Sequence, residues 1–231
     1  MKKFLLSSLA ALSIFVSSSS FAWDVKKMDA QINNDLYVLK LSEGICSAFD
    51  APKQGRVITA AHCVGDALEK DKNESIVINS DYKFPLSQKW VANDGSIYNS
   101  LSFAKLIDVD LKKDVAVLEM LPNNLNHKNN VKIREERPIR GEDVYVAGAP
   151  FGQINNLSKG IVSDSVSVLN TFPNIYVYRL DAFIGPGNSG GPVYDTDGNV
   201  IGVISSIIGS ENGSSWSYAI PIKFIDKTLI E

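Results

Sequence analysis

Short runs in which apolar and polar residues alternate recur along most of the chain and limit the folds it can adopt. In residues 35–41 (DLYVLKL), Tyr37, Leu39 and Leu41 share one face, because successive side chains of a β-strand point to opposite sides. Many short strands separated by turn residues predict an all-β sandwich or barrel. The last run, IKFIDKTLIE (222–231), indicates a short C-terminal helix. The other alternating runs are ESIVINS, FAKLIDVD, DVAVLEM, EDVYVAG, GIVSDSVSV, IYVYRLDA, PVYD, VIGVISSI and WSYAIPI.

A polar connection divides the chain into two strand-rich halves. Residues 121–143 are rich in asparagine and charge and poor in apolar side chains, which is typical of a linker between domains. We therefore expect one strand-rich unit over residues 23–135 and a second over residues 136–231. His127 lies inside the connection, and its asparagine-rich surroundings indicate a solvated surface residue without a chemical role.

The N-terminus has the pattern of a secretory signal. Lys2 and Lys3 precede an apolar stretch of about 13 residues, and a small residue, Ala22, closes the segment. The alternative is an uncleaved membrane anchor, but an anchor needs roughly 18–20 apolar residues to span a bilayer. We expect residues 1–22 to be removed and the chain to reach the periplasm or the medium of a bacterium. No later run predicts stable membrane insertion.

The charge balance argues against two classes of partner. The formal net charge is −3, and it becomes −5 once the segment that contains Lys2 and Lys3 is removed. Proteins that bind nucleic acid or anionic membranes by electrostatics carry a concentrated positive charge. We therefore expect neither nucleic acid nor a membrane surface as a partner, and no motif indicates a cofactor.

The two cysteines, Cys46 and Cys63, form an even pair in a chain predicted to be exported. Cysteines in an oxidising compartment favour a disulfide. A buried pair of free thiols and half of a metal site are the alternatives. Because no second cluster of cysteine and histidine completes a zinc site, we expect no metal.

A serine surrounded by glycines is the first candidate for chemistry. Ser189 lies in GPGNSGGP (185–192), which can be read as a tight turn, because glycine tolerates positive φ. The sharper interpretation is a nucleophile whose backbone must approach a substrate closely. A serine nucleophile needs a base, a group that orients the base, and N–H groups that stabilise an oxyanion.

Candidates for the base and the orienting group precede Ser189. The chain has two histidines, and His62 is the serious candidate for the base. Asp114 opens the apolar run DVAVLEM, so the strand after it is expected to be buried; Asp108 and Asp110 are rivals on spacing alone. The order His, Asp, Ser is that of the chymotrypsin arrangement and differs from those of subtilisins and α/β-hydrolases.

The motifs TAAHC (59–63), DVAVL (114–118) and GNSGGP (187–192) resemble the signature stretches of trypsin/chymotrypsin-like serine proteases. The resemblance covers nearly the whole exported chain and implies two packed six-stranded antiparallel β-barrels with a cleft between them. It implies a catalytic triad of His62, Asp114 and Ser189. It also implies an oxyanion hole formed by Gly187 and Ser189 and a disulfide between Cys46 and Cys63.

Longer stretches are similar to the bacterial HtrA-type branch of this family. They are VYVAGAPFG (144–152), KGIVS (159–163) and LDAFIGPGNSGGPVYDTDGNVIGV (180–203), in which Asn188 precedes the nucleophile. HtrA-type proteases usually carry a C-terminal PDZ domain, whereas this sequence ends at Glu231. We therefore expect a stand-alone protease rather than one whose substrates a PDZ domain selects.

The resemblance also implies where substrate binds. Phe183 lies six positions before the nucleophile, near the base of the pocket that receives the residue before the cut. Ser205, Ser206 and Ile207 resemble the edge segment that pairs with the substrate backbone, and Ser205 is also expected to bond with Asp114. The expected partners are protein or peptide substrates.

Two functions remain open from the sequence. The first is a secreted serine endopeptidase that works through an acyl-enzyme intermediate. The alternative is a pseudo-protease that binds a protein partner without cleaving it. Such proteins usually lose a triad residue, and this sequence retains all three, which favours the enzyme.

Overall fold

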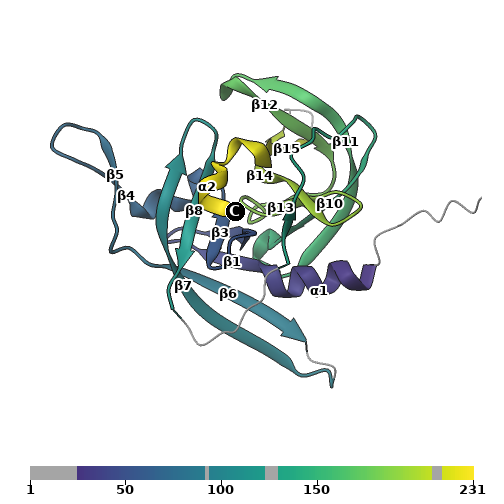
Figure 1. Cartoon of the computed structure of the whole chain (residues 1–231), viewed down its shortest axis with the longest axis horizontal. Coiled ribbons are helices and arrows are strands. Elements are labelled where there is room, and N and C mark those ends of the chain that lie inside the picture. Colours follow the sequence, from purple (N-terminus) through teal and green to yellow (C-terminus); the bar gives the residue numbers. More distant parts are fainter. Residues whose placement is uncertain (1–24, 92–93, 123–129, 210–214) are drawn as a thin grey trace, which may run out of the picture.

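Two closed barrels of six antiparallel strands make up most of the computed structural model of the chain (Figure 1). The structure describes residues 25–91, 94–122, 130–209 and 215–231. The two barrels confirm the predicted fold class. The predicted signal sequence, residues 1–22, lies outside the described residues. Among the helices that are described, none has the length and apolar character needed to cross a membrane.

The first barrel closes in the strand order β1-β2-β3-β8-β7-β6. Side chains that point inward form its apolar core, which includes Leu39, Phe84 and Leu118. β8 begins directly after Asp114, so this aspartate lies at the rim of the barrel. The strands are β1 (Leu36–Lys40), β2 (Ile45–Asp50), β3 (Arg56–Thr59), β6 (Phe84–Val91), β7 (Ile97–Asp110) and β8 (Val115–Met120).

The second barrel closes because β13 pairs with both β10 and β14. A short additional strand, β9 (Lys132–Ile133), runs parallel to β14. The chain thus joins the second sheet at Lys132, before the boundary expected at residue 136. The six strands of the barrel are β10 (Asp143–Gly148), β11 (Asn156–Leu169), β12 (Phe172–Asp181), β13 (Pro192–Tyr194), β14 (Asn199–Gly209) and β15 (Ser215–Pro221).

Helices and short strands complete the structure. The C-terminal helix α2 (Lys227–Ile230) confirms the prediction, and Asp226 caps it by accepting the N–H of Thr228 at 2.9 Å. The N-terminal helix α1 (Val25–Asp35) was not predicted; it buries Met28 and Ile32. The remaining elements are the strands β4 (Leu68–Lys70) and β5 (Ile76–Ile78) and the turns η1 (Ala61–Ala67), η2 (Pro150–Gly152) and η3 (Ile222–Phe224).

A shared apolar cluster joins the two barrels. Phe49, Ile58 and Val117 of the first barrel belong to the same buried cluster as Val203 and Ile220 of the second. Burial of apolar surface is the main favourable term in folding, so this cluster holds the barrels against each other. The candidate nucleophile Ser189 and the candidate base His62, which come from different barrels, therefore lie across a packed junction.

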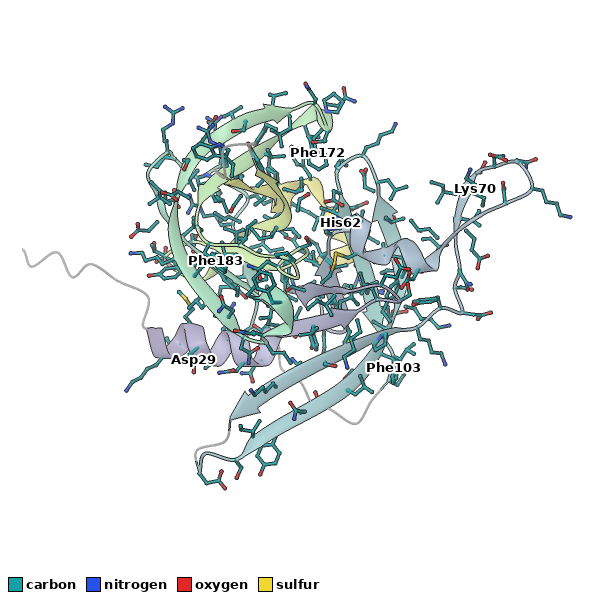
Figure 2. The ribbon with its side chains drawn as sticks, turned by 180° about the vertical axis from the view of Figure 1, so that it is seen from behind. Asp29, His62, Lys70, Phe103, Phe172 and Phe183 are labelled. Atoms are coloured by element: carbon teal, nitrogen blue, oxygen red, sulfur yellow. A yellow bond between two sulfur atoms is a disulfide. The ribbon has the colours of Figure 1, made fainter. Side chains whose placement is uncertain are left out.

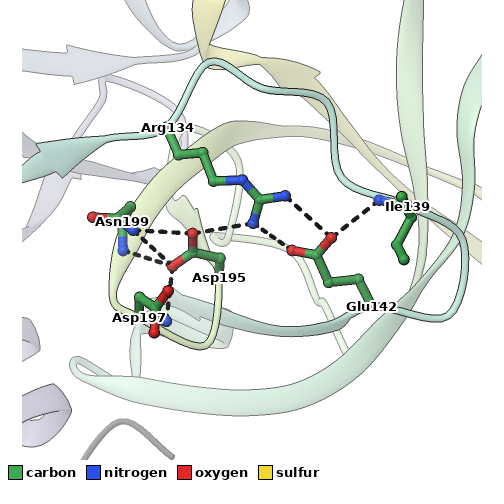
Figure 3. A network of polar contacts seen from close by, with 6 residues as sticks. All are labelled: Arg134, Ile139, Glu142, Asp195, Asp197 and Asn199. Carbon is green, nitrogen blue, oxygen red and sulfur yellow. Dashed lines mark hydrogen bonds and ion pairs between the residues drawn. The ribbon is translucent and has the colours of Figure 1, made fainter. Parts of the chain in front are cut away.

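An ionic network attaches the connecting segment to the second barrel (Figure 3). Arg134, directly after β9, binds both carboxylate oxygens of Glu142 and reaches Asp195 Oδ2 at 3.2 Å. Asp195 Oδ1 also accepts the N–H groups of Asp197 and Asn199, each at 2.9 Å. The hydrogen bond with Glu142, followed by that with Asp195, raises the pKa of Arg134 above its usual value. The network thereby fixes the turn between β13 and β14.

Candidate active site

The nucleophile candidate Ser189 lies in a glycine-rich loop between β12 and β13. Gly187 has φ +103° and Gly190 has φ +83°, a region that favours glycine. A Cβ on Gly187 would lie 2.4 Å from the Ala149 carbonyl oxygen, and one on Gly190 would lie 2.2 Å from the Ser47 carbonyl oxygen. The glycines are therefore required by close backbone packing as well as by φ. Ser189 itself is half-buried, and its Oγ donates to the Ser205 carbonyl at 3.2 Å.

The base candidate His62 is held by two hydrogen bonds to one carboxylate. β3 ends at Thr59, and the chain turns into η1, which places His62 at the rim of the first barrel. Its Nδ1 lies 3.0 Å from both carboxylate oxygens of Asp114, and its backbone N–H donates to Asp114 Oδ1 at 2.9 Å. The His62 side chain is 48% exposed and that of Asp114 only 10%. A buried carboxylate thus orients a solvent-accessible imidazole.

The turn between β7 and β8 selects Asp114 over its two rivals. Asp108 is exposed. Asp110 accepts the N–H groups of Lys112 and Lys113 at 3.0 Å and therefore caps the turn. Asp114 has φ +54°, a left-handed conformation that aspartate tolerates better than most residues. Strained backbone of this kind is concentrated at functional sites.

Ser205 links Asp114 to the candidate nucleophile. Its Oγ donates to Asp114 Oδ2, which is the hydrogen bond expected from the sequence, and its carbonyl accepts the Ser189 hydroxyl. Asp114 therefore accepts hydrogen bonds from the His62 N–H, the His62 ring and the Ser205 hydroxyl.

The three predicted triad residues line one open cavity of about 500 Å³. Figure 2 shows Phe172, at the start of β12, close to His62. Leu111, Thr171 and Phe172 could not be predicted from the sequence, because their position depends on how two hairpins meet across the barrels. The lining residues are His62, Leu111, Asp114, Thr171, Phe172, Ser189 and Ser205.

The N–H groups of Gly187 and Ser189, which were predicted to form an oxyanion hole, are available to donate to a substrate oxygen. Within the described part of the chain, neither N–H donates a hydrogen bond. The Pro186 carbonyl accepts the Phe151 N–H at 2.7 Å. Because the Pro186–Gly187 peptide is trans, the Gly187 N–H points away from Phe151.

A disulfide joins Cys46 on β2 to Cys63 in η1, with their Cα atoms 6.1 Å apart. It confirms the predicted pairing and ties the turn that carries His62 to the neighbouring strand. Together with His62, these cysteines form a cluster whose ligand atoms lie within 4.8 Å of one another. Both sulfurs are oxidised in the disulfide, so neither offers the thiolate that a metal would need.

The residues that were expected to bind substrate lie in different surroundings. Phe183 is 60% exposed, and its expected place near the base of a substrate pocket stays a prediction. Ser206 and Ile207 belong to β14, where their backbones pair with Tyr218 and Ser217, but their side chains lie outside the described part of the structure. Ser205 lines the cavity beside Ser189.

Comparison with known proteins places the chain in one family. Residues 42–203 match the trypsin-like peptidase domain. The chain is 33% identical over 183 residues to a Pseudomonas putida protein named "Probable periplasmic serine endoprotease DegP-like", covering 78% of this chain and 33% of that protein. It is 30% identical over 193 residues to "Protease Do-like 1, chloroplastic" of Arabidopsis thaliana, covering 81% of this chain and 39% of that protein. The chain thus spans about a third of the length of these relatives.

Solved structures show the same fold. The structure titled "HtrA-type protease AlgW with tripeptide" superposes with a TM-score of 0.64 at 25% identity, covering 87% of this chain and 60% of that one. The crystal structure of Deg5 superposes with a TM-score of 0.62 at 22% identity, covering 87% of this chain and 89% of that one. The chain belongs to the trypsin-like peptidase family, and the relatives that it matches are proteases of the DegP and HtrA type.

Proposed function

We propose that the chain is a serine endopeptidase in which Ser189 is the nucleophile, His62 the general base and Asp114 the residue that orients the base. The observation that carries this proposal is the pair of hydrogen bonds between His62 Nδ1 and Asp114, beside the cavity that also contains Ser189. With Nδ1 bonded to a carboxylate, the lone pair of Nε2 is left to accept a proton.

Acylation begins with a rotation of the Ser189 hydroxyl. Its proton, now directed at the Ser205 carbonyl, turns to His62 Nε2, and Oγ attacks the scissile carbonyl carbon. The imidazolium then gives the proton to the leaving amine nitrogen as the C–N bond breaks. Water repeats the sequence on the acyl-enzyme: His62 takes its proton, the ester bond breaks, and Ser189 recovers its hydrogen. Asp114 stabilises the imidazolium throughout.

We also propose that the N–H groups of Gly187 and Ser189 stabilise the oxyanion of both tetrahedral intermediates. Their lack of other acceptors within the described residues supports this role. Donors already in place need no reorganisation when the charge develops, and the loss of one such donor costs about 10²–10³ in kcat.

The proposed substrates are proteins or peptides in the periplasm or the medium of a bacterium. The DegP-like relatives are named periplasmic endoproteases, and the N-terminal segment has the pattern of an export signal. The apolar side chains of Leu111 and Phe172 line the cavity beside the triad, so it suits an apolar substrate residue.

A pseudo-protease remains the second candidate because of one contact. The Ser189 hydroxyl donates to Ser205 rather than to His62, which is the geometry of a nucleophile that is not engaged with its base. If that arrangement persists when a partner binds, the cleft recognises a protein without cleaving it.

A fluorophosphonate probe separates the two candidates. The full-length chain is produced in a bacterium, its exported product is purified, and the labelled residue is identified by peptide mapping. We expect Ser189 to be labelled, Ser189→Ala to remain unlabelled, and the matched surface variant Ser75→Ala to label like the wild type. Folded wild-type protein that does not label would favour the pseudo-protease. The N-terminal sequence of the same product tests cleavage after Ala22.

A further inference from the structure

Ser47 is a buried residue of the first barrel that contacts the nucleophile loop of the second. It lies on β2 beside Cys46 and is 0% exposed. Its N–H donates to the Ser189 carbonyl at 2.7 Å. Its hydroxyl donates to the Gly187 carbonyl at 2.7 Å and accepts the Ala149 N–H at 2.9 Å. One residue therefore binds the carbonyls of both residues whose N–H groups are the proposed oxyanion donors.

The surroundings of Ser47 leave its hydroxyl little freedom. A Cβ on Gly148 would lie 3.1 Å from Ser47 Oγ, and one on Gly191 would lie 3.3 Å from Ser47 Cβ. Glycines thus allow the second barrel to close around this side chain. The Gly187 carbonyl and the Ala149 N–H belong to buried residues and would lose this partner if the hydroxyl were removed, and an unpaired buried polar group is unfavourable.

The two peptide groups that flank the Gly187 Cα are both held from outside the loop. The Pro186 carbonyl accepts the Phe151 N–H, and the Gly187 carbonyl accepts the Ser47 hydroxyl. Gly187 has φ +103°, and glycine can adopt many other conformations at little cost. A rotation of the Pro186–Gly187 peptide would turn the Gly187 N–H away from the position where the oxyanion forms. The Ser47 hydroxyl opposes such a rearrangement from the other side of the Gly187 Cα, because it holds the next peptide in place.

We propose that Ser47 is a positioning residue of the active site, whose hydroxyl holds the Gly187 backbone so that the Gly187 N–H keeps the direction needed to stabilise the oxyanion. This inference rests on the proposed function of Ser189. Ser47 is fully buried and makes no hydrogen bond to a triad side chain, so it acts through the backbone of Gly187. An interaction that matters only in the transition state changes the rate of the bond-forming step and leaves ground-state binding unchanged.

The test compares Ser47→Ala with Thr59→Val. Thr59 is also 0% exposed, and its Oγ1 donates to the Ser47 carbonyl at 2.8 Å, but it bonds no group of the nucleophile loop. Both variants remove one buried hydroxyl at the same place in the barrel, so both lower the melting temperature. The rate of fluorophosphonate labelling of Ser189 is measured over a range of probe concentrations, which separates the maximal rate from the half-saturating concentration.

For Ser47→Ala we expect the maximal labelling rate to fall about ten- to a hundredfold, less than or equal to the loss of a whole oxyanion donor. The half-saturating concentration should change by less than about twofold. The downfield NMR signal of the His62 Nδ1 proton should persist, because the bond with Asp114 is untouched. Thr59→Val should label at the wild-type rate.

Two results would overturn the inference in distinguishable ways. If wild-type protein labels and Ser47→Ala labels at the same maximal rate, or if Thr59→Val slows as much, Ser47 is structural only and the proposed function stands. If folded wild-type protein does not label at Ser189, the proposed function fails and this role of Ser47 fails with it.

Discussion

Arg134 shows how much one buried contact can contribute at the scale of a residue. The Asp195 side chain is 2% exposed and depends on Arg134 for its neutralising charge. Removing one partner of a buried ion pair leaves a charge without compensation, which costs about 3–5 kcal/mol. The backbone N–H groups of Asp197 and Asn199 still stabilise Asp195, so the lower end of that range applies.

We therefore expect Arg134→Met to lower the free energy of unfolding by about 3 kcal/mol. In a chain of this size that corresponds to roughly 6–12 °C in melting temperature. The control is Arg140→Met, which removes an ion pair with Asp164 at 3.7 Å from a side chain that is 77% exposed. A surface pair contributes at most about 1 kcal/mol. Equal losses in the two variants would show that the Arg134 network does not stabilise the fold.

The sequence could predict site residues whose side chains have distinctive chemistry. It could not predict residues whose role depends on which groups the fold places beside them. His62, Asp114 and Ser189 were identified by residue type and order, and the structure places all three at one cavity. Ser47 gave no signal, because its role consists of hydrogen bonds to backbone groups more than a hundred residues away. Phe183 was assigned by position alone, and its exposed side chain gives that assignment no support.

At the scale of elements, strands were predicted better than the N-terminal helix. Alternation of apolar and polar residues shows directly in a sequence such as that of β1. Among the α1 side chains that the structure describes, the fully buried apolar ones are Met28 and Ile32, and asparagines near the helix end are poor helix formers. Its stability comes from packing, because Met28 and Ile32 join the apolar cluster between the barrels. Local sequence therefore gave little indication of a helix.

The disulfide stabilises an element rather than the chemistry. It closes a loop between residues 17 positions apart, which restricts the unfolded chain and contributes about 3 kcal/mol. The double variant Cys46→Ala/Cys63→Ala should melt roughly 6–12 °C below the wild type. Its labelling rate should change less than that of Ser47→Ala, because Asp114 still holds His62 through two groups.

Reductant provides the control for this prediction. It should lower the melting temperature of the wild type to that of the double variant and leave the double variant unchanged. Equal melting temperatures of oxidised and reduced wild type, with thiol titration showing full reduction, would contradict a stabilising role for the bond between Cys46 and Cys63.

At the scale of the whole molecule, two barrels that look separate in sequence share a core between them, in addition to the core that each encloses. The polar connection indicated two units, and each barrel does close on itself. The sequence could not show that Phe49 and Ile58 pack in one cluster with Val203 and Ile220, because pairing between distant strands depends on the final docking of the barrels. This shared core holds the two halves of the candidate active site in register.

The shared core predicts that both barrels unfold together. Scanning calorimetry should give one transition whose calorimetric and van't Hoff enthalpies agree, as for a single cooperative unit. Leu86→Ala removes a side chain buried entirely within the first barrel's own core and should cost about 2–5 kcal/mol. We expect it to shift the whole transition without splitting it. Two transitions, of which the variant moves only one, would mean that the barrels unfold independently and that the cluster between them contributes little to stability.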